Sequence, residues 1–295
     1  MISMAIYYSL GNRLKHKKNN LLILQFHIPF FPLGNYVELI TYYKGYQPPH
    51  TIERLLPDGG IDLIIDLTEV AKHIYDNDSL KEMQSCKRAW LSGMRTEFIS
   101  IQARAAESEM LVIRFRPGMA WSFLHMPVLE IKDKVVDAEL VFGNELLSFR
   151  EQLLEQADSA QKFAVAETYL LQRIKNHVEV HPAIRYCISQ ISNNPSQTSI
   201  RKITHKTGYS SKHLISLFGK YAGINPKQYV SVLKFQQAVQ LLENNPGQIN
   251  WTGLALDCGY YDQAHFINEF KRFSGFNPSA YMELRGDYIN YIPVR

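Results

Sequence analysis

One pattern occurs twice near the C-terminal end: GYSSKHLISLFGKYAGINPKQYV at residues 208–230 and GYYDQAHFINEFKRFSGFNPSAYM at residues 259–282. At an offset of 52, residues 210–229 and 262–281 are identical at seven of twenty positions, and the second copy has one extra residue near Tyr261. The identical pairs are His213/His265, Ile215/Ile267, Phe218/Phe270, Gly223/Gly275, Asn225/Asn277, Pro226/Pro278 and Tyr229/Tyr281. Both copies are therefore predicted to adopt the same local structure.

Each copy predicts a helix, a short turn and a second helix. In the first copy, Thr198 or Ser199 can cap a helix, Gly208 permits a left-handed turn, and Ser210 can cap the next helix. The second copy has Asn250, Gly259 and Asp262 in the same roles. Apolar residues recur at helical spacing in every segment, so each helix can bury one face.

A third helix is expected after each copy. Asn225-Pro226 and Asn277-Pro278 each place a capping residue before a proline that suits the first helical position. The helix after the first copy, about residues 226–243, is long and would join the two units rigidly.

Two helix-turn-helix units suggest double-stranded DNA as the partner, because the N-terminal part of a second helix can enter the major groove. We expect base contacts from Ser211, Lys212, Ile215, Ser216, Gln263, Ala264, His265, Ile267 and Asn268. Phosphate contacts are expected from Arg201, Lys202, Lys206, Lys220, Lys227, Lys271 and Arg272.

The net charge along the chain also points to a nucleic acid bound by the C-terminal part. Residues 1–177 hold 20 Lys and Arg against 21 Asp and Glu, a net charge of −1, whereas residues 178–295 hold 12 against 7, a net charge of +5. The basic C-terminal part thus favours a polyanionic partner. An all-helical repeat with a solvated basic rim is the alternative on spacing and charge alone.

The two quoted segments closely resemble the signature segments of the AraC/XylS family of transcriptional regulators, over roughly residues 180–283. The resemblance implies two helix-turn-helix units that read adjacent major-groove segments. Thr204, Ser216, Asn268 and Trp251 depart from the usual family pattern. The target sequence therefore cannot be transferred from a relative.

The N-terminal part is rich in strands. The runs LLILQFHI, YVELITYY, IDLIIDL, EFISIQARA and EMLVIRFR favour a mostly antiparallel sheet, sandwich or barrel, and Pro57-Asp58-Gly59-Gly60 predicts a tight turn. ERLLPDGGIDLII and VIRFRPGMAWSFL resemble a cupin-like domain found on some of these regulators. The expected fold class is α+β, with a cupin-like regulatory domain at 1–143, a helical connector at 144–177 and a DNA-binding domain at 178–295.

Two amphipathic helices are expected in the connector, joined around Asp158-Ser159. Their apolar stripes can either pack on the sheet or pair subunits in a homodimer. The stripes consist of Leu146, Phe149, Leu153, Phe163, Ala166, Leu170 and Ile174.

A small-molecule effector is expected to bind a pocket inside the sheet domain. The candidate contacts are Tyr42, Tyr43, Trp90, Arg95, Arg114, Arg116 and Trp121. Arg114 and Arg116 share a strand face and could meet an anion, although such arginines are more often solvated or paired with a carboxylate.

No catalytic residue, metal site or cofactor is predicted. His27, His50, His73 and His125 are isolated from one another in the sequence, and phosphate-loop and nucleophile-elbow motifs are absent. The rival classes are a repair enzyme fused to the same DNA-binding module, which would need a reactive cysteine such as Cys86, and an architectural DNA binder without an effector.

Cellular location is predicted to be the cytoplasm. The three cysteines are far apart and fit reduced thiols. The basic stretch at 15–18 and the apolar run after it superficially resemble a signal peptide, but Gln25, His27, Pro29 and Pro32 interrupt the run. We therefore expect neither secretion nor a membrane span.

Overall fold

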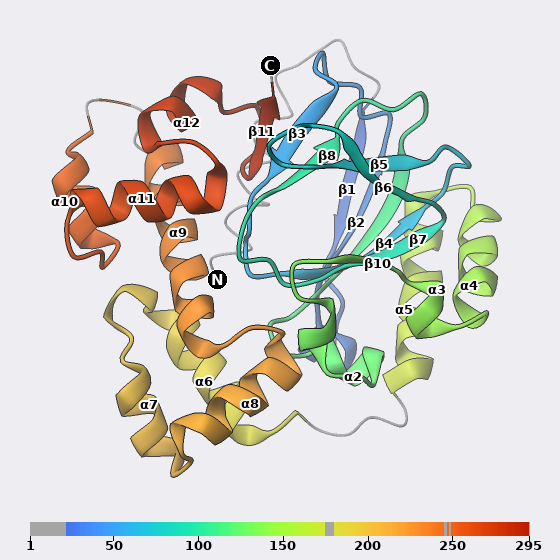
Figure 1. The fold of residues 1–295 in the computed structure, drawn as a ribbon. Helices are drawn as coiled ribbons and strands as arrows, with labels where there is room; N and C mark the ends of the chain where they lie inside the picture. Colours follow the sequence, from blue (N-terminus) through green and yellow to red (C-terminus); the bar gives the residue numbers. More distant parts are fainter. Residues whose placement is uncertain (1–21, 175–179, 245–246, 248, 295) are drawn as a thin grey trace.

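The computed structural model describes residues 22–174, 180–244, 247 and 249–294. The basic stretch at 15–18 and the expected boundary at 177/178 lie outside these residues. Figure 1 shows a strand-rich N-terminal part beside a helical C-terminal part, which confirms the α+β fold class.

Eleven strands form two antiparallel sheets in the described part of the chain. The first sheet has the order β1-β2-β9-β4-β7-β10. Its strands are β1 (Ile23–His27), β2 (Val37–Lys44), β4 (Ile61–Asp66), β7 (Ala89–Ser92), β9 (Glu109–Phe115) and β10 (Val135–Asp137). All five runs expected as strands contribute a strand to one sheet or the other.

The second sheet has the order β11-β3-β8-β5-β6. Its strands are β3 (Ile52–Leu55), β5 (Lys72–Tyr75), β6 (Glu82–Cys86), β8 (Ile99–Gln102) and β11 (Tyr291–Val294). The last of them was not expected, because residues 178–295 were predicted to be entirely helical. It pairs antiparallel with β3, with Tyr291 opposite Leu55, and lies along the edge of the sandwich in Figure 1.

The turn at residues 57–60 forms as predicted. Gly59 has a φ of +82°, and the backbone N–H of Gly60 donates to Asp58 Oδ1 at 3.0 Å. This turn leads directly into β4, which occupies the middle of the first sheet.

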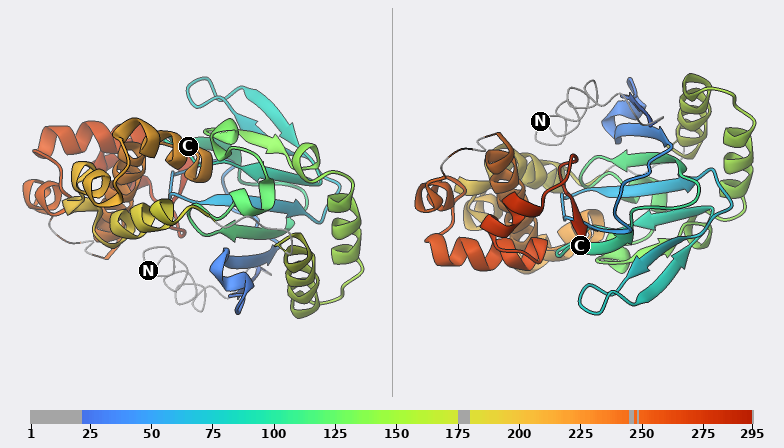
Figure 2. Two further views of the ribbon diagram at one scale, coloured as in Figure 1. Left: turned by 90° about the horizontal axis from the view of Figure 1, so that it is seen from below. Right: turned by 90° about the horizontal axis from the view of Figure 1, so that it is seen from above.

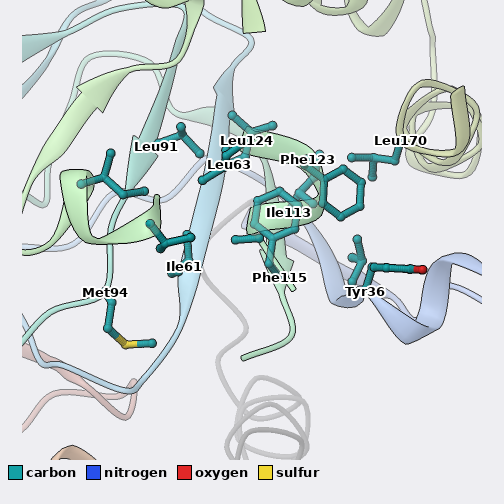
Figure 3. Packing of buried hydrophobic residues seen from close by; sticks show 14 of the residues in the cluster. Tyr36, Ile61, Leu63, Leu91, Met94, Ile113, Phe115, Phe123, Leu124 and Leu170 are labelled. Carbon is teal, nitrogen blue, oxygen red and sulfur yellow. The ribbon is translucent and has the colours of Figure 1, made fainter. Parts of the chain in front are cut away.

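Alternation along β9 separates two environments. Leu111, Ile113 and Phe115 are buried on the outer face of the first sheet, whereas Met110 and Val112 face the space between the sheets. Aromatic and aliphatic side chains from the helices complete the outer core, including Phe123, Leu124 and Leu170 (Figure 3). The main core of this part therefore lies between one sheet and its helices, and the interior of the sandwich is left less filled.

Among the described residues, four α-helices belong to the N-terminal part, and α4 and α5 lie on the side of the sandwich away from the C-terminal helices (Figures 1 and 2). They are α2 (Trp121–Leu124), α3 (Glu139–Phe142), α4 (Glu145–Leu154) and α5 (Ser159–Ile174). All seven residues of the predicted apolar stripes are buried in the core of the same chain. These stripes are therefore not available as a subunit interface, because their side chains are already buried within the chain.

The C-terminal part consists of helices before it ends in β11. They are α6 (Pro182–Asn193), α7 (Ile200–Thr207), α8 (Ser211–Ala222), α9 (Pro226–Asn244), α10 (Trp251–Asp257), α11 (Gln263–Ser274) and α12 (Pro278–Leu284). Residues of α6, α8 and the first half of α9 belong to the same buried cluster as the N-terminal core. The second half of α9 belongs to a separate cluster with α10, α11 and α12.

Candidate nucleic-acid interface

The first helix-turn-helix unit consists of α7 and α8. Ser199 Oγ accepts from the backbone N–H of Lys202, and Ser210 Oγ accepts from that of His213. Gly208 lies between the helices at a φ of +73°, where a side chain would be strained. The predicted caps and turn are therefore all present, and they end α7 and start α8 at defined residues.

The second unit, α10 and α11, repeats this arrangement. Asn250 and Asp262 cap its helices through hydrogen bonds to the N–H groups of Gly253 and His265. The Phe235 ring of α9 stacks on Phe273 at a centroid distance of 4.9 Å and meets the edge of Phe270 at 5.1 Å. Since all three rings are buried, α9 holds the second unit through a rigid aromatic cluster.

The residues expected to contact bases lie at the start of α8 and of α11. Seven of the nine are exposed, namely Ser211, Lys212, Ile215, Ser216, Ala264, His265 and Asn268. Gln263 and Ile267 are partly buried, because Gln263 accepts a hydrogen bond from Thr252 Oγ1 and Ile267 packs against the second core cluster. Their role in base contact stays a prediction.

The residues expected to contact phosphate are all exposed. Lys206 Nζ lies 5.5 Å from the centre of the Tyr186 ring of the neighbouring α6, and two others are held by an ion pair or by the N-terminal part. Arg272 forms a bidentate ion pair with Glu269, at 2.8 and 3.1 Å. Lys220 Nζ lies 4.9 Å from the centre of the Trp121 ring, on the N-terminal part. The other five are Arg201, Lys202, Lys206, Lys227 and Lys271, and none of them forms an ion pair with a residue that the structure describes.

A loop of the N-terminal part, residues 93–98 between β7 and β8, contacts both units. A Cβ placed on Gly223, at the end of α8, would lie 3.4 Å from Met94 Cβ. Arg272 of α11 donates to the Thr96 carbonyl at 3.4 Å. The loop therefore lies against both helix-turn-helix units.

Arg54 strengthens the contact with the second unit. Its guanidinium lies between the rings of Phe98 and Phe276, 4.3 Å from each ring centre, and one N–H reaches the Ser274 carbonyl at 3.5 Å. Burial lowers the pKa of Arg54, with Asp78 opposing the shift. The planar cation thereby joins β3 to the residues that follow α11.

A cavity of about 260 Å³ lies between the two sheets of the N-terminal part. Three of the residues expected to contact an effector, Tyr43, Trp90 and Arg114, are in its wall. Arg114 is held by Asp62 at 2.7 and 2.8 Å and also by Asp58. Its charge is therefore neutralised within the chain, and the expectation that Arg114 meets an anion is not supported.

The other four expected effector contacts lie outside this wall. Tyr42 has the opposite strand orientation to Tyr43 and donates to Glu109 at 2.9 Å, and Arg116 Nε donates to the Gly34 carbonyl at 2.6 Å. Trp121 packs against α8.

Arg95 is buried beside Asp133 in the loop that contacts both units. Desolvation lowers its pKa to about 10, and the Asp133 and Glu97 carboxylates oppose the shift. Like Trp121, Arg95 is therefore part of the structure around the domain contact and does not line the cavity.

Most of the wall residues were not expected from the sequence, and four of them matter for the chemistry of the cavity. They are Tyr46, Glu53, Tyr288 and Tyr291, which gather at one end of the cavity. Alternation along β3 could have placed Glu53 on an inner face, but no local signal connects the two C-terminal tyrosines to residues more than 230 positions earlier.

Three of the histidines singled out in the sequence lie beside carboxylates. His27, His50 and His73 each lie within 3.1 Å of a carboxylate, from Glu167, Glu53 and Glu82 respectively. Within the described ranges, no three His, Cys, Asp or Glu side chains gather closely enough to hold a metal ion.

Cys86, the cysteine that a repair enzyme would need, is buried in β6. Burial, with a smaller effect of Asp137, raises the pKa of its thiol to about 11. This is the opposite of the lowered pKa that a nucleophilic thiol requires.

Two known families match separate parts of the chain. Residues 203–283 match a family described as a helix-turn-helix domain. Residues 25–137 match a domain of unknown function. In the part of the chain that the structure describes, no helix combines the length and apolar character needed to cross a bilayer.

Similar proteins include transcription regulators. The chain is 26% identical over 114 residues to the raffinose operon transcriptional regulatory protein RafR of Pediococcus pentosaceus, a match that covers 39% of each protein. It is 34% identical over 67 residues to the uncharacterized regulator YbfI of Bacillus subtilis, covering 23% of each. The chain thus spans about two fifths or less of the length of these relatives. Among solved structures, ToxT of Vibrio cholerae matches with a TM-score of 0.45 and 11% identity, over 88% of this chain and 98% of that one.

Proposed function

Because its C-terminal part is a helix-turn-helix domain of the AraC/XylS type, we propose that this chain is a sequence-specific, DNA-binding regulator of transcription that acts in the cytoplasm. In this proposal residues 1–143 are the regulatory part, 144–177 the connector and 178–295 the DNA-binding part. The regulator carries out no chemical reaction.

The observation that carries the proposal is the repeated pair of capped helices. α8 and α11 each begin at a side-chain cap and expose polar or small residues over their first turn. A helix presented in this way can enter the major groove, where each base pair offers a distinct set of hydrogen-bonding groups. The basic residues on and beside both units supply the attraction to phosphate.

Selection from a random duplex library, followed by a gel-shift titration, tests this proposal. The full chain is used, because the core of the first unit is continuous with the N-terminal core and the isolated C-terminal part would expose it. Enrichment of one sequence that binds more tightly than random DNA is expected. If the folded chain enriches no sequence, the proposal is wrong.

Regulation by a small molecule is the second part of the proposal. The cavity between the sheets supports it, since a purely architectural DNA binder has no use for such a space. The Tyr291 side chain in its wall belongs to the strand that follows the second helix-turn-helix unit. An effector in the cavity would therefore touch the part of the chain that it regulates.

A homodimer formed through another surface of the N-terminal part stays a prediction, since the connector stripes are covered. Sedimentation of the full chain at several concentrations tests it. A mass of one chain throughout the micromolar range would exclude it there.

A further inference from the structure

We propose that the cavity between the sheets binds a small hydrophobic organic cation, whose ammonium group lies against Glu53 and is surrounded by Tyr43, Tyr46, Tyr288 and Tyr291. This inference rests on the proposed function, because it names the chemical class of the effector that such a regulator would respond to. We refer to these five residues as the tyrosine end of the cavity.

Glu53 supplies the negative charge. Its side chain is 3% exposed and lies in the cavity wall. Within the described part of the chain, its two hydrogen-bonding partners, Tyr46 Oη at 3.0 Å and His50 Nε2 at 3.1 Å, both reach Oε2. A buried carboxylate is costly unless a cation or several donors compensate it. A ligand ammonium at Oε1 would provide that compensation.

The two cations in the wall, Arg114 and Lys72, are already paired with carboxylates. Arg114 is held between Asp58 and Asp62, and Lys72 Nζ lies 3.1 Å from the buried Asp66. These two pairs leave one carboxylate in excess around Arg114, and Glu53 adds another. The wall and its ion pairs are therefore net negative. An anionic ligand would have to displace an existing partner of Arg114 or Lys72.

The four tyrosines suit the binding of a cation. The rings of Tyr46 and Tyr288 meet edge to face at 5.6 Å, and the Tyr43 and Tyr291 side chains complete the enclosure. Burial, with Glu53 adding to the effect, raises the pKa of each of these phenols. The rings therefore stay neutral, and their faces can attract a quaternary or primary ammonium group.

The rest of the wall is mainly apolar, and the volume of the cavity limits the size of the ligand. Most of its side chains are aliphatic or aromatic, among them Leu24, Phe26, Ile64, Ile74, Ile101 and Val112. Ligand pockets usually have a volume of about 300–1,000 Å³, so a cavity of about 260 Å³ is at the small end. It fits one ring or a short branched chain attached to the ammonium group.

The experiment compares three probes of nearly equal shape: benzyltrimethylammonium, its uncharged carbon analogue neopentylbenzene, and the anion phenylacetate. Binding to the full chain is measured by calorimetry and by the fluorescence of Trp90, which is in the wall. The titrations are run at pH 8, where phenylacetate is fully ionised and the charges of the other two probes do not depend on pH. The ammonium probe is expected to bind about tenfold more tightly than the neutral analogue, and phenylacetate is expected not to bind.

Variants locate the site. Glu53→Gln keeps both hydrogen-bonding positions. It is expected to lower the affinity for the ammonium probe about tenfold or more and to leave the affinity for the neutral analogue unchanged. Tyr291→Leu should weaken the ammonium probe as well, whereas Tyr43→Phe keeps the ring and should not. Glu107→Gln, an exposed change of the same charge, is the matched control.

Several results would overturn the proposal. The proposal is wrong if the ammonium and neutral probes bind equally well or if phenylacetate binds tightly. It is also wrong if Glu53→Gln leaves the affinity for the ammonium probe unchanged. Failure of all probes to bind a folded chain that still binds DNA would also overturn it and leave the regulator proposal intact. Conversely, ammonium binding by a chain that selects no DNA sequence would refute the regulator proposal alone.

Discussion

The salt dependence of DNA binding can be worked out from the exposed cations. Seven basic residues are expected to contact phosphate, and the structure pairs Arg272 with Glu269 and places Lys220 on Trp121. Five cations then remain to contact DNA. Each phosphate contact contributes about −0.9 to the slope of log K against log salt, so the expected slope is about −4.5. Between 0.1 and 0.2 M salt, the affinity should therefore fall about 20-fold.

The perturbation is Lys202→Ala, which removes one of these cations from an exposed position on α7. The slope of log K against log salt for this variant should be shallower by about 0.9 than that of the unmodified chain. Its affinity should then fall only about 12-fold between 0.1 and 0.2 M salt. Lys81→Ala is the matched control, since Lys81 is exposed in the turn between β5 and β6. Fluorescence anisotropy of a labelled duplex carrying the selected site, titrated at several NaCl concentrations, measures all three slopes.

A slope shallower than about −2 for the unmodified chain would refute the assignment of the five cations, since it would leave room for only about two phosphate contacts. An unchanged slope in Lys202→Ala would remove that residue from the set. A slope near −6.3 would show that Lys220 and Arg272 leave their partners in the chain when DNA binds, because seven contacts would then be made.

Three further predictions concern single contacts. Lys212→Ala or His265→Ala should weaken binding to the selected sequence by about 1 to 3 kcal/mol and affect binding to random DNA little. The reason is that both side chains are exposed where α8 and α11 begin. Equal losses of affinity for both DNAs in a gel-shift titration would exclude a base contact. A double-mutant cycle of Arg54→Ala and Phe276→Ala should give a coupling of about 0.5–1 kcal/mol in urea unfolding. Additive effects there would contradict the stacking of the guanidinium. Burial, with Asp257 adding to the effect, raises the pKa of Cys258 to about 12. Its thiol should therefore stay protonated at pH 8 and react with a disulfide reagent only after the chain unfolds. Rapid modification of Cys258 in the folded chain, detected by mass spectrometry, would contradict its burial.

The helix-turn-helix units could be predicted from the sequence because their determinants are local. Ser210 caps α8 through a residue three positions away, and Gly208 adopts its left-handed backbone without help from distant residues. Asp262 acts in the same way at α11. Capping and turn chemistry of this kind depends on a few neighbouring residues, so it can be identified without knowing the tertiary structure.

The cavity could be predicted only in part, because its wall is assembled from distant segments. Tyr43 and Tyr42 are adjacent and chemically alike, yet alternation along β2 sends one into the cavity and the other to Glu109. Choosing between them requires knowing which face of the strand is covered. Arg114 lines the cavity, but its neutralisation depends on Asp58 and Asp62, which reach it through the pairing of β9 with β4.

The late position of β11 in the chain has a consequence for synthesis. Its partner β3 is made more than 230 residues earlier, so one edge of the second sheet stays unpaired until Tyr291–Val294 have left the ribosome. An unpaired edge is a template for association with other chains, and pairings between distant segments form slowly. A chain that terminates before Tyr291 would keep that edge open permanently. We expect such truncated products to aggregate or to be degraded, so that only completed chains accumulate as folded protein.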